Sequence, residues 1–117
     1  MNALQGRRLL INEYSQLQIL RNIKEDISQT SLSKEIGYSV GKVNFILKAL
    51  VEKGLVKCDR FIASDNRQKY VYLLTDEGIK EKMSLTKKFI DKKKAEYEEL
   101  QKELEEDRLR WAGVLSE

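Results

Sequence analysis

The stretch SLSKEIGYSVGKVNFILKALVEKG, residues 31–54, contains two short helix patterns joined by a very tight connection. The first pattern ends at Gly37, a residue type that commonly terminates helices. The second begins after Ser39, a good N-cap, and ends at Gly54. Its apolar residues follow the spacing of one helix face: Val43, Ile46, Leu47 and Leu50. Two short helices separated by a glycine, one residue and a cap predict a helix-turn-helix.

A further helix is predicted upstream of this stretch, over about residues 11–25. Apolar residues recur there every three positions and form one face: Tyr14, Leu17, Leu20 and Ile23. The polar segment that follows supplies capping residues, and either Ser28 or Thr30 begins the next helix. In that second helix, Leu32 and Ile36 are expected to face the core together with Ile27.

Downstream, residues 55–61 and 69–74 are two strand candidates rich in Val, Leu, Tyr and Phe. The polar residues 62–68 link them, so a β-hairpin is expected directly after the helix-turn-helix, in the position of a wing. Thr75 is a plausible N-cap for a last helix, with acidic residues favourable in its first turn. From there the sequence reads as one long helix.

The long helix carries a heptad seam at alternating spacings of four and three residues. The seam consists of Ile79, Met83, Thr86, Ile90, Lys93, Tyr97, Leu100, Leu104, Asp107 and Trp111. Such a helix is roughly 55 Å long at ~1.5 Å per residue, more than a small core covers. A second copy of the chain is the simplest partner; the alternative is a helix folded back on its own domain. The expected dimerisation residues are Ile79, Met83, Ile90, Tyr97, Leu100, Leu104 and Trp111.

These elements predict a mainly α fold with a small β-hairpin. Residues 1–75 form a winged helix-turn-helix domain, and residues 76–117 a coiled-coil helix. The chain of 117 residues has a formal net charge of +3. Residues 1–75 hold 12 basic against 7 acidic side chains, and residues 76–117 hold 10 against 12. The excess of basic side chains in residues 1–75 is a weak indication of nucleic-acid binding.

The single cysteine, Cys58, and the absence of histidine exclude an internal disulfide and a Cys/His zinc site. Cys58 falls in a predicted strand and is expected to be a buried structural thiol. The sequence contains no catalytic constellation and no apolar run of membrane-spanning length. We therefore expect a cytoplasmic protein that is not an enzyme and needs no cofactor.

The second helix of the helix-turn-helix leaves polar and small residues outside its apolar face. An α-helix fits the DNA major groove, where Asn44 can read adenine and Lys42 can reach guanine or phosphate. Gly41 lets the backbone approach closely, and Ser39 at the cap can donate to a phosphate. The candidate DNA-binding residues of this helix are Ser39, Val40, Gly41, Lys42, Asn44, Phe45 and Lys48.

The wing carries a charged tip. Arg67 is a candidate for the minor groove, where narrow A·T tracts concentrate negative potential. Asp65, two residues earlier, can orient Arg67 through a charge-assisted bond. Arg60 and Lys69 are expected to face phosphates. Besides a DNA-binding regulator, the sequence leaves open a winged-helix module that binds another protein through its long helix and has lost DNA binding.

The ordered set LSKEIGYSVGKVNFILKALVEKGLV, then DNR, then YLLTDEG resembles the MarR family of winged helix-turn-helix transcription factors. The segments SVGKVNFILKALVEKGLVK and YVYLLTDEGIKEKMSLTKKFIDKKKAEYEEL are similar to its short, EPS-associated subgroup, linked with exopolysaccharide gene clusters. The resemblance covers residues from about Asn12 to about Leu104.

The resemblance implies a homodimer on a near-palindromic double-stranded DNA site, with the third helix in the major groove and the wing in the minor groove. It places Ser39, Gly41, Lys42, Asn44 and Lys48 on the recognition helix. Arg67 falls on the wing-tip arginine and Asp65 on the acidic residue that often precedes it. Cys58 lies where redox-sensing members do not place theirs, so the resemblance names no effector.

Overall fold

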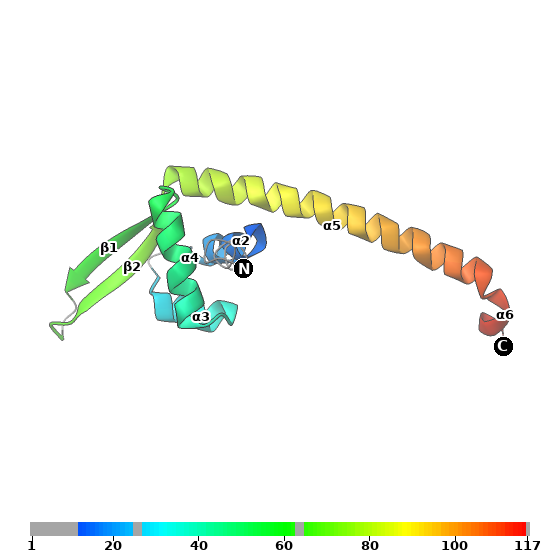
Figure 1. The fold of residues 1–117 in the computed structure, drawn as a ribbon, viewed down its shortest axis with the longest axis horizontal. Coiled ribbons are helices and arrows are strands. Elements are labelled where there is room, and N and C mark those ends of the chain that lie inside the picture. The colour runs from blue at the N-terminus through cyan, green and yellow to red at the C-terminus, as the bar shows by residue number, and fades with distance from the viewer. Residues whose placement is uncertain (1–11, 25–26, 63–64, 117) are drawn as a thin grey trace, which may run out of the picture. The chain divides into compact units, whose positions relative to one another are not determined.

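The computed structural model describes residues 12–24, 27–62 and 65–116. The chain divides into two compact units, Met1–Leu85 and Thr86–Glu117. The elements, coloured from blue to red in Figure 1, are α2 (Glu13–Asn22), α3 (Gln29–Ile36), α4 (Val40–Glu52), β1 (Val56–Ile62), β2 (Gln68–Leu74), α5 (Asp76–Arg110) and α6 (Ala112–Leu115). The ends expected for the first helix, at residues 11 and 25, lie outside the described residues.

The predicted helix-turn-helix is confirmed, with its cap residues. Ser28 caps α3 by accepting the N–H of Ser31, and Ser39 caps α4 by accepting the N–H of Lys42. Gly37 ends α3 in the left-handed region at φ 84°, which a side chain would disfavour. The Ser33 hydroxyl donates to the Tyr38 carbonyl at 2.6 Å and ties the turn to α3.

The core of the first unit lies between the helices and the base of the hairpin. Its buried apolar residues are Leu17, Ile19, Leu20, Ile23, Leu32, Val43, Ile46, Leu47, Leu50, Val56 and Leu85. The four apolar residues expected to be buried on α4 are all fully covered. The expectation that Tyr14 faces the core is wrong: its side chain is 50% exposed, and Ile19 is buried on α2 instead.

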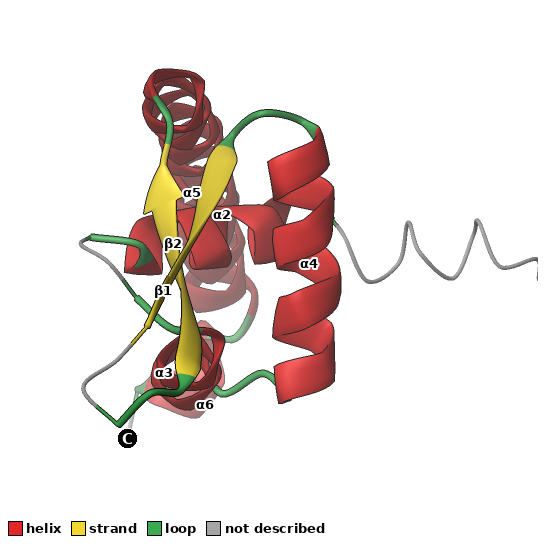
Figure 2. Ribbon diagram, turned by 90° about the vertical axis from the view of Figure 1, so that its left-hand side faces the viewer, coloured by secondary structure: helices red, strands yellow, loops and turns green. Residues whose placement is uncertain are grey.

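The wing is an antiparallel hairpin in which Val56 faces Leu74 at the base and Ile62 faces Gln68 at the far end. In Figure 2 the two strands cross in projection, and a short loop connects the end of α4 to β1. A third segment joins the hairpin, because the Tyr72 N–H donates to the Ile27 carbonyl at 2.9 Å. This bridge fixes β2 to the residues that precede α3.

The start of α5 is fastened to the end of α4 through Thr75. Its hydroxyl donates to the Gly54 carbonyl at 2.7 Å and accepts the Gly78 N–H at 2.9 Å. The Thr75 N–H in turn donates to the Leu55 carbonyl. A Cβ on Gly78 would overlap the Leu55 carbonyl oxygen, so only glycine fits this close approach.

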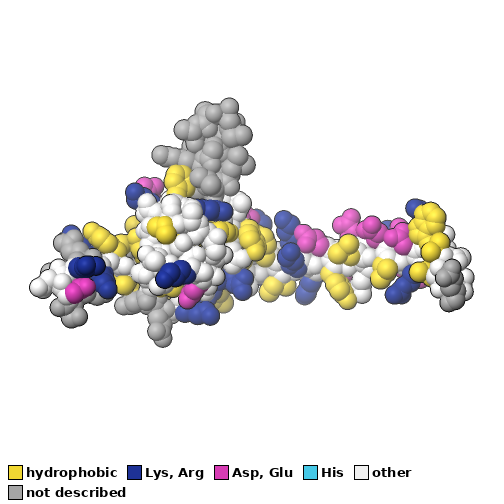
Figure 3. Space-filling view, turned by 90° about the horizontal axis from the view of Figure 1, so that it is seen from below, with side chains coloured by type: hydrophobic (Ala, Val, Ile, Leu, Met, Phe, Trp, Pro, Cys, Tyr) yellow, Lys and Arg dark blue, Asp and Glu magenta, His cyan; other side chains and the backbone are white. Residues whose placement is uncertain are grey.

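α5 is confirmed as a long helix of 35 residues, but it ends at Arg110 and not beyond. Trp111 leaves the helical region at φ −112° and ψ 26°, and the short α6 follows, so the expectation of one continuous helix is wrong at its C-terminal end. The apolar residues of the seam are exposed, from 46% for Ile79 to 67% for Met83 (Figure 3).

Candidate nucleic-acid interface

The exposed side of α4 presents the residues that the sequence predicts for DNA reading. Lys48 and the first residues of α4 with their cap are exposed, whereas Lys42, Asn44 and Phe45 are half-buried. The Lys42 ammonium lies 3.8 Å from the centre of the Tyr38 ring, a cation–π contact that holds it beside the turn. Gln29 donates to the Val40 carbonyl at 3.3 Å and links the two helices at this surface.

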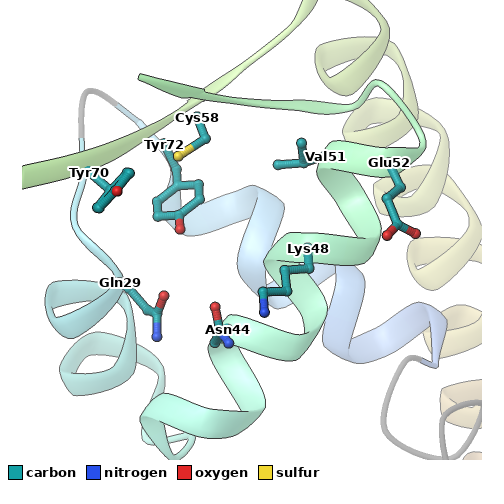
Figure 4. Close-up of a pocket in the computed structure, with 8 residues that line it drawn as sticks. All are labelled: Gln29, Asn44, Lys48, Val51, Glu52, Cys58, Tyr70 and Tyr72. Carbon is teal, nitrogen blue, oxygen red and sulfur yellow. The ribbon is translucent and has the colours of Figure 1, made fainter. Parts of the chain in front are cut away.

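A hollow of about 510 Å³ lies between α4, the start of α3 and the wing (Figure 4). Asn44 and Lys48 line it from α4, and Tyr70 and Tyr72 line it from β2. A second hollow, of about 440 Å³, shares Gln29 and both tyrosines and adds Lys69. The two hollows bring predicted residues of α4 and of the wing to one surface of amide, aromatic and cationic groups, to which Val51, Glu52 and Cys58 also contribute.

Cys58 lies in the wall of this surface, and its thiol is exposed. The expectation of a buried structural thiol is therefore wrong. Cys58 pairs with Tyr72 across the hairpin. Among the described residues the sheet consists of these two strands alone, and they do not bury the Cys58 side chain. Burial raises the pKa of the Tyr72 phenol, and the neighbouring Cys58 and Tyr70 side chains raise that pKa further.

The wing tip has the geometry expected for an oriented arginine. One Asp65 carboxylate oxygen accepts the Arg67 backbone N–H at 3.2 Å, and the other lies 3.8 Å from the Arg67 Nε. Asn66 between them adopts a left-handed φ of 63°, which asparagine tolerates well. The Arg67 side chain is nevertheless 82% exposed, so it is accessible to a partner.

The two remaining predicted cations lie on the strands of the wing. Arg60 is exposed and pairs in register with Tyr70. Because paired residues share one face of a hairpin, Arg60 stands on the face that lines the hollow. Lys69 is exposed and lines the second hollow.

Sequence reasoning missed Gln29 and Tyr70 as members of this surface. Gln29 is the first residue of α3, and only the packing of α3 on α4 brings it beside Asn44. Tyr70 was assigned only to the strand pattern. Its pairing with Arg60 in the hairpin shows that one face of the wing is polar and aromatic.

Two other kinds of site, a metal centre and a membrane-spanning helix, are absent from the described ranges 12–24, 27–62 and 65–116. No cluster of three or more His, Cys, Asp or Glu side chains able to hold a metal ion occurs among these residues. Within the same ranges, no helix has the length and apolar character needed to cross a membrane.

Comparisons with known proteins agree with this architecture. Residues 13–57 match the family model described as "Winged helix-turn-helix DNA-binding". No curated protein matches the chain. The fold defined by these elements is a winged helix-turn-helix followed by a long helix.

Solved structures share this fold at low sequence identity. The PcaV transcriptional regulator of Streptomyces coelicolor, in complex with its natural ligand, is similar with a TM-score of 0.64, 17% identity, and 97% of this chain and 88% of that chain covered. The putative transcriptional regulator TA0346 of Thermoplasma acidophilum is similar with a TM-score of 0.60 and 20% identity, and the match covers 92% of this chain and 96% of that chain. A mutant of S. aureus MepR bound to an oligodeoxyribonucleotide is similar with a TM-score of 0.55 and 20% identity, and the match covers 97% of this chain and 87% of that chain.

Proposed function

We propose that the protein is a sequence-specific, double-stranded DNA-binding transcriptional regulator. The observation that carries this proposal is the joint surface of α4 and the wing, where Asn44, Lys48 and Tyr70 line one hollow. The tip of the same wing carries an exposed Arg67. The match of residues 13–57 to a winged helix-turn-helix DNA-binding model supports it. The MepR mutant with bound oligodeoxyribonucleotide is a protein of similar fold that binds DNA.

In this proposal α4 enters the major groove. Asn44 reads a base edge, since an asparagine amide offers a donor and an acceptor to adenine. Lys42, held over the Tyr38 ring, and Lys48 contact phosphate or guanine. Ser39, Val40, Gly41 and Phe45 belong to the part of α4 and its cap that approaches the duplex, with the positive end of the helix dipole favouring a phosphate.

The wing enters the minor groove with Arg67 at its tip, oriented by Asp65. Arg60 and Lys69, both exposed on the strands, contact phosphates and add affinity without sequence preference. Each such contact releases counterions, so affinity falls steeply as salt rises.

The regulator acts as a homodimer joined through the seam of α5, on a near-palindromic operator whose half-sites lie about one helical turn, or roughly 34 Å, apart. The exposed apolar seam of α5 supports a dimer, because an unpaired stripe of this length calls for a partner. The resemblance to the EPS-associated subgroup of the MarR family points to exopolysaccharide genes as the regulated genes.

Selection of bound duplexes from a random pool, followed by footprinting, tests this function. A symmetric site is expected, and no enrichment of any sequence would contradict sequence-specific binding. Lys42→Ala then weakens binding to all duplexes and lowers the salt slope by about one, whereas Asn44→Ala mainly lowers specificity at one position. If neither substitution changes binding in an anisotropy assay, α4 is not the recognition helix.

The alternative is a module that binds another protein through α5 and has lost DNA binding, and the same exposed seam would serve it. Retention on a random-sequence duplex column at low salt separates the two. A DNA-binding regulator is retained and elutes as salt rises. A protein that flows through at low salt is the interaction module.

A further inference from the structure

The part of α5 that belongs to the second unit carries an apolar seam interrupted by two charges. Ile90, Tyr97, Leu100 and Leu104 are 49–63% exposed, at successive spacings of seven, three and four residues. Lys93 and Asp107 occupy two positions of the same row and are exposed as well. In the single chain Lys93 forms a surface pair with Glu96, with 3.6 Å between Nζ and Oε2.

Charge is distributed unevenly along this helix. Residues 87–94 contain five lysines and one aspartate, whereas residues 96–107 contain seven acidic residues and one lysine. Figure 3 shows the dark blue groups followed by magenta groups along α5. The helix therefore has a basic segment followed by an acidic segment, and this polarity distinguishes the two ways in which a second copy can lie along it.

We infer that the occupant of the seam is a second copy of the chain bound in the antiparallel direction, with the two-fold axis between Tyr97 and Leu100. This inference rests on the dimer in the proposed function and adds its orientation. In a parallel, in-register pair every charge faces its own copy. Lys93 would face Lys93 inside the seam, and Asp107 would face Asp107, about 21 Å from the opposite charge at ~1.5 Å per residue.

The antiparallel arrangement removes this conflict. Tyr97 faces Leu100 of the second copy, Lys93 faces Leu104, and Ile90 faces Asp107. Lys93 and the Asp107 of the second copy then lie three residues apart along the axis, about 4.5 Å, within reach of a lysine side chain. Two-fold symmetry makes this pair twice. The basic segment of each copy lies beside acidic residues of the other, so the charges are complementary.

Two like-charge pairs flank the seam in this register, Glu96 with Glu103 and Lys87 with Arg108. All four side chains are exposed in the single chain, where like charges cost little because water screens them. The charges inside the seam weigh more, since they lose water on association. The orientation is therefore decided by Lys93 and Asp107.

The antiparallel pair also sets how far apart the two copies of Leu85 lie. Leu85, the last residue of the first unit, is about 13 residues from the proposed axis. The two copies of Leu85 are then about 40 Å apart along the helix axis at ~1.5 Å per residue. A parallel pair would bring the two copies of Leu85 to the same end.

Spin-label distances test the orientation on the full chain. Ser84 is exposed on α5 and accepts cysteine with little change in size; Cys58→Ser removes the native exposed thiol. Labels at Ser84→Cys lie about 44 Å apart along the axis in the antiparallel pair. They lie within roughly 25 Å in a parallel pair of helices packed about 10 Å apart. Labels at Glu98→Cys, beside the axis, are close in both and form the matched control.

A short distance at both positions overturns the antiparallel orientation and leaves the dimer in place. Absence of a dipolar interaction at Glu98→Cys overturns the dimer of the proposed function together with the orientation. A long distance at Ser84→Cys and a short one at Glu98→Cys support the inference. Duplex binding, measured on the same samples, reports separately on the DNA-binding part of the proposed function.

A charge swap gives an independent readout. Lys93→Asp places two acidic side chains beside each other twice in the antiparallel seam, and we expect the dimer dissociation constant to rise roughly tenfold or more. Lys93→Asp combined with Asp107→Lys restores dimerisation. In a parallel dimer Lys93→Asp only replaces one repelling pair by another, so an unchanged dissociation constant by sedimentation equilibrium would overturn the inference. Circular dichroism confirms that the variants keep their helix.

Discussion

Replacement of Gly41 by alanine is expected to separate folding stability from DNA binding. Gly41 lies in the first turn of α4, on the face shared with Asn44 and Lys48, which follow three and seven residues later. A Cβ at this position meets no atom within 4 Å, and the backbone is not in the left-handed region. The fold therefore accepts the methyl group without strain.

Both effects of the methyl group have a physical magnitude. Alanine is favoured over glycine inside a helix by about 0.5–1 kcal/mol. A domain of this size gains roughly 4–8 °C in melting temperature per kcal/mol, so Gly41→Ala is expected to melt about 2–8 °C higher. In the proposed complex with DNA, the methyl group would occupy the space through which the α4 backbone approaches a phosphate. Loss of one hydrogen bond to a charged oxygen costs about 1.5–3 kcal/mol, a decrease of roughly tenfold or more in affinity.

Thermal melting by circular dichroism and fluorescence anisotropy with the selected operator measure the two effects. Gly113→Ala is the matched control, because its Cβ also meets nothing within 4 Å but lies in α6, outside the proposed interface. The control is expected to leave operator affinity unchanged. A Gly41→Ala variant that binds the operator as tightly as the parent chain would refute the close approach of α4. A lower melting temperature would refute the open space around Gly41.

Substitutions at three further positions test the junction and the wing. Gly78→Ala forces a methyl group against the Leu55 carbonyl oxygen and is expected to lower the free energy of unfolding by about 1–3 kcal/mol, read from the urea midpoint; an unchanged midpoint would contradict this contact. Thr75→Val removes the hydroxyl that caps α5 and costs about 1 kcal/mol, whereas Thr75→Ser keeps the cap and stays near the parent value in the same urea titration. Asp65→Asn keeps the acceptor for the Arg67 N–H but removes the ion pair that orients Arg67, so operator affinity measured by anisotropy is expected to fall. A rise in affinity would instead show that the carboxylate only repels phosphate.

The local elements of the fold could be predicted from the sequence because short-range chemistry determines them. Ser28, Ser39 and Thr75 each accept the backbone N–H that their cap position implies, and Gly37 and Gly54 adopt positive φ values. The spacing of the apolar residues on α4 similarly identified its buried face. These features depend on residues no more than a few positions apart, and the sequence displays that range directly.

Features that depend on which surface covers another were not predictable in the same way. Cys58 follows an apolar strand pattern, but a hairpin of two strands has a face that nothing in the described residues fully covers. Tyr14 continues the apolar spacing of α2, but its side chain is half exposed. Ile19, which lies outside that spacing, is buried instead. Gln29 joins the proposed interface only because α3 packs across α4. Periodicity locates a stripe on an element and leaves open what lies against it.

The seam of α5 shows both sides of this distinction. Its apolar period was visible in the sequence because a helix of 35 residues repeats the pattern several times. Lys93 and Asp107 interrupt that period, and a charge inside an apolar seam lowers its stability. Placed on one helix row, Lys93 and Asp107 become complementary instead, because a copy running in the opposite direction brings each beside the other. Charges that repel each other in the parallel dimer thus attract each other in the antiparallel dimer and select that orientation.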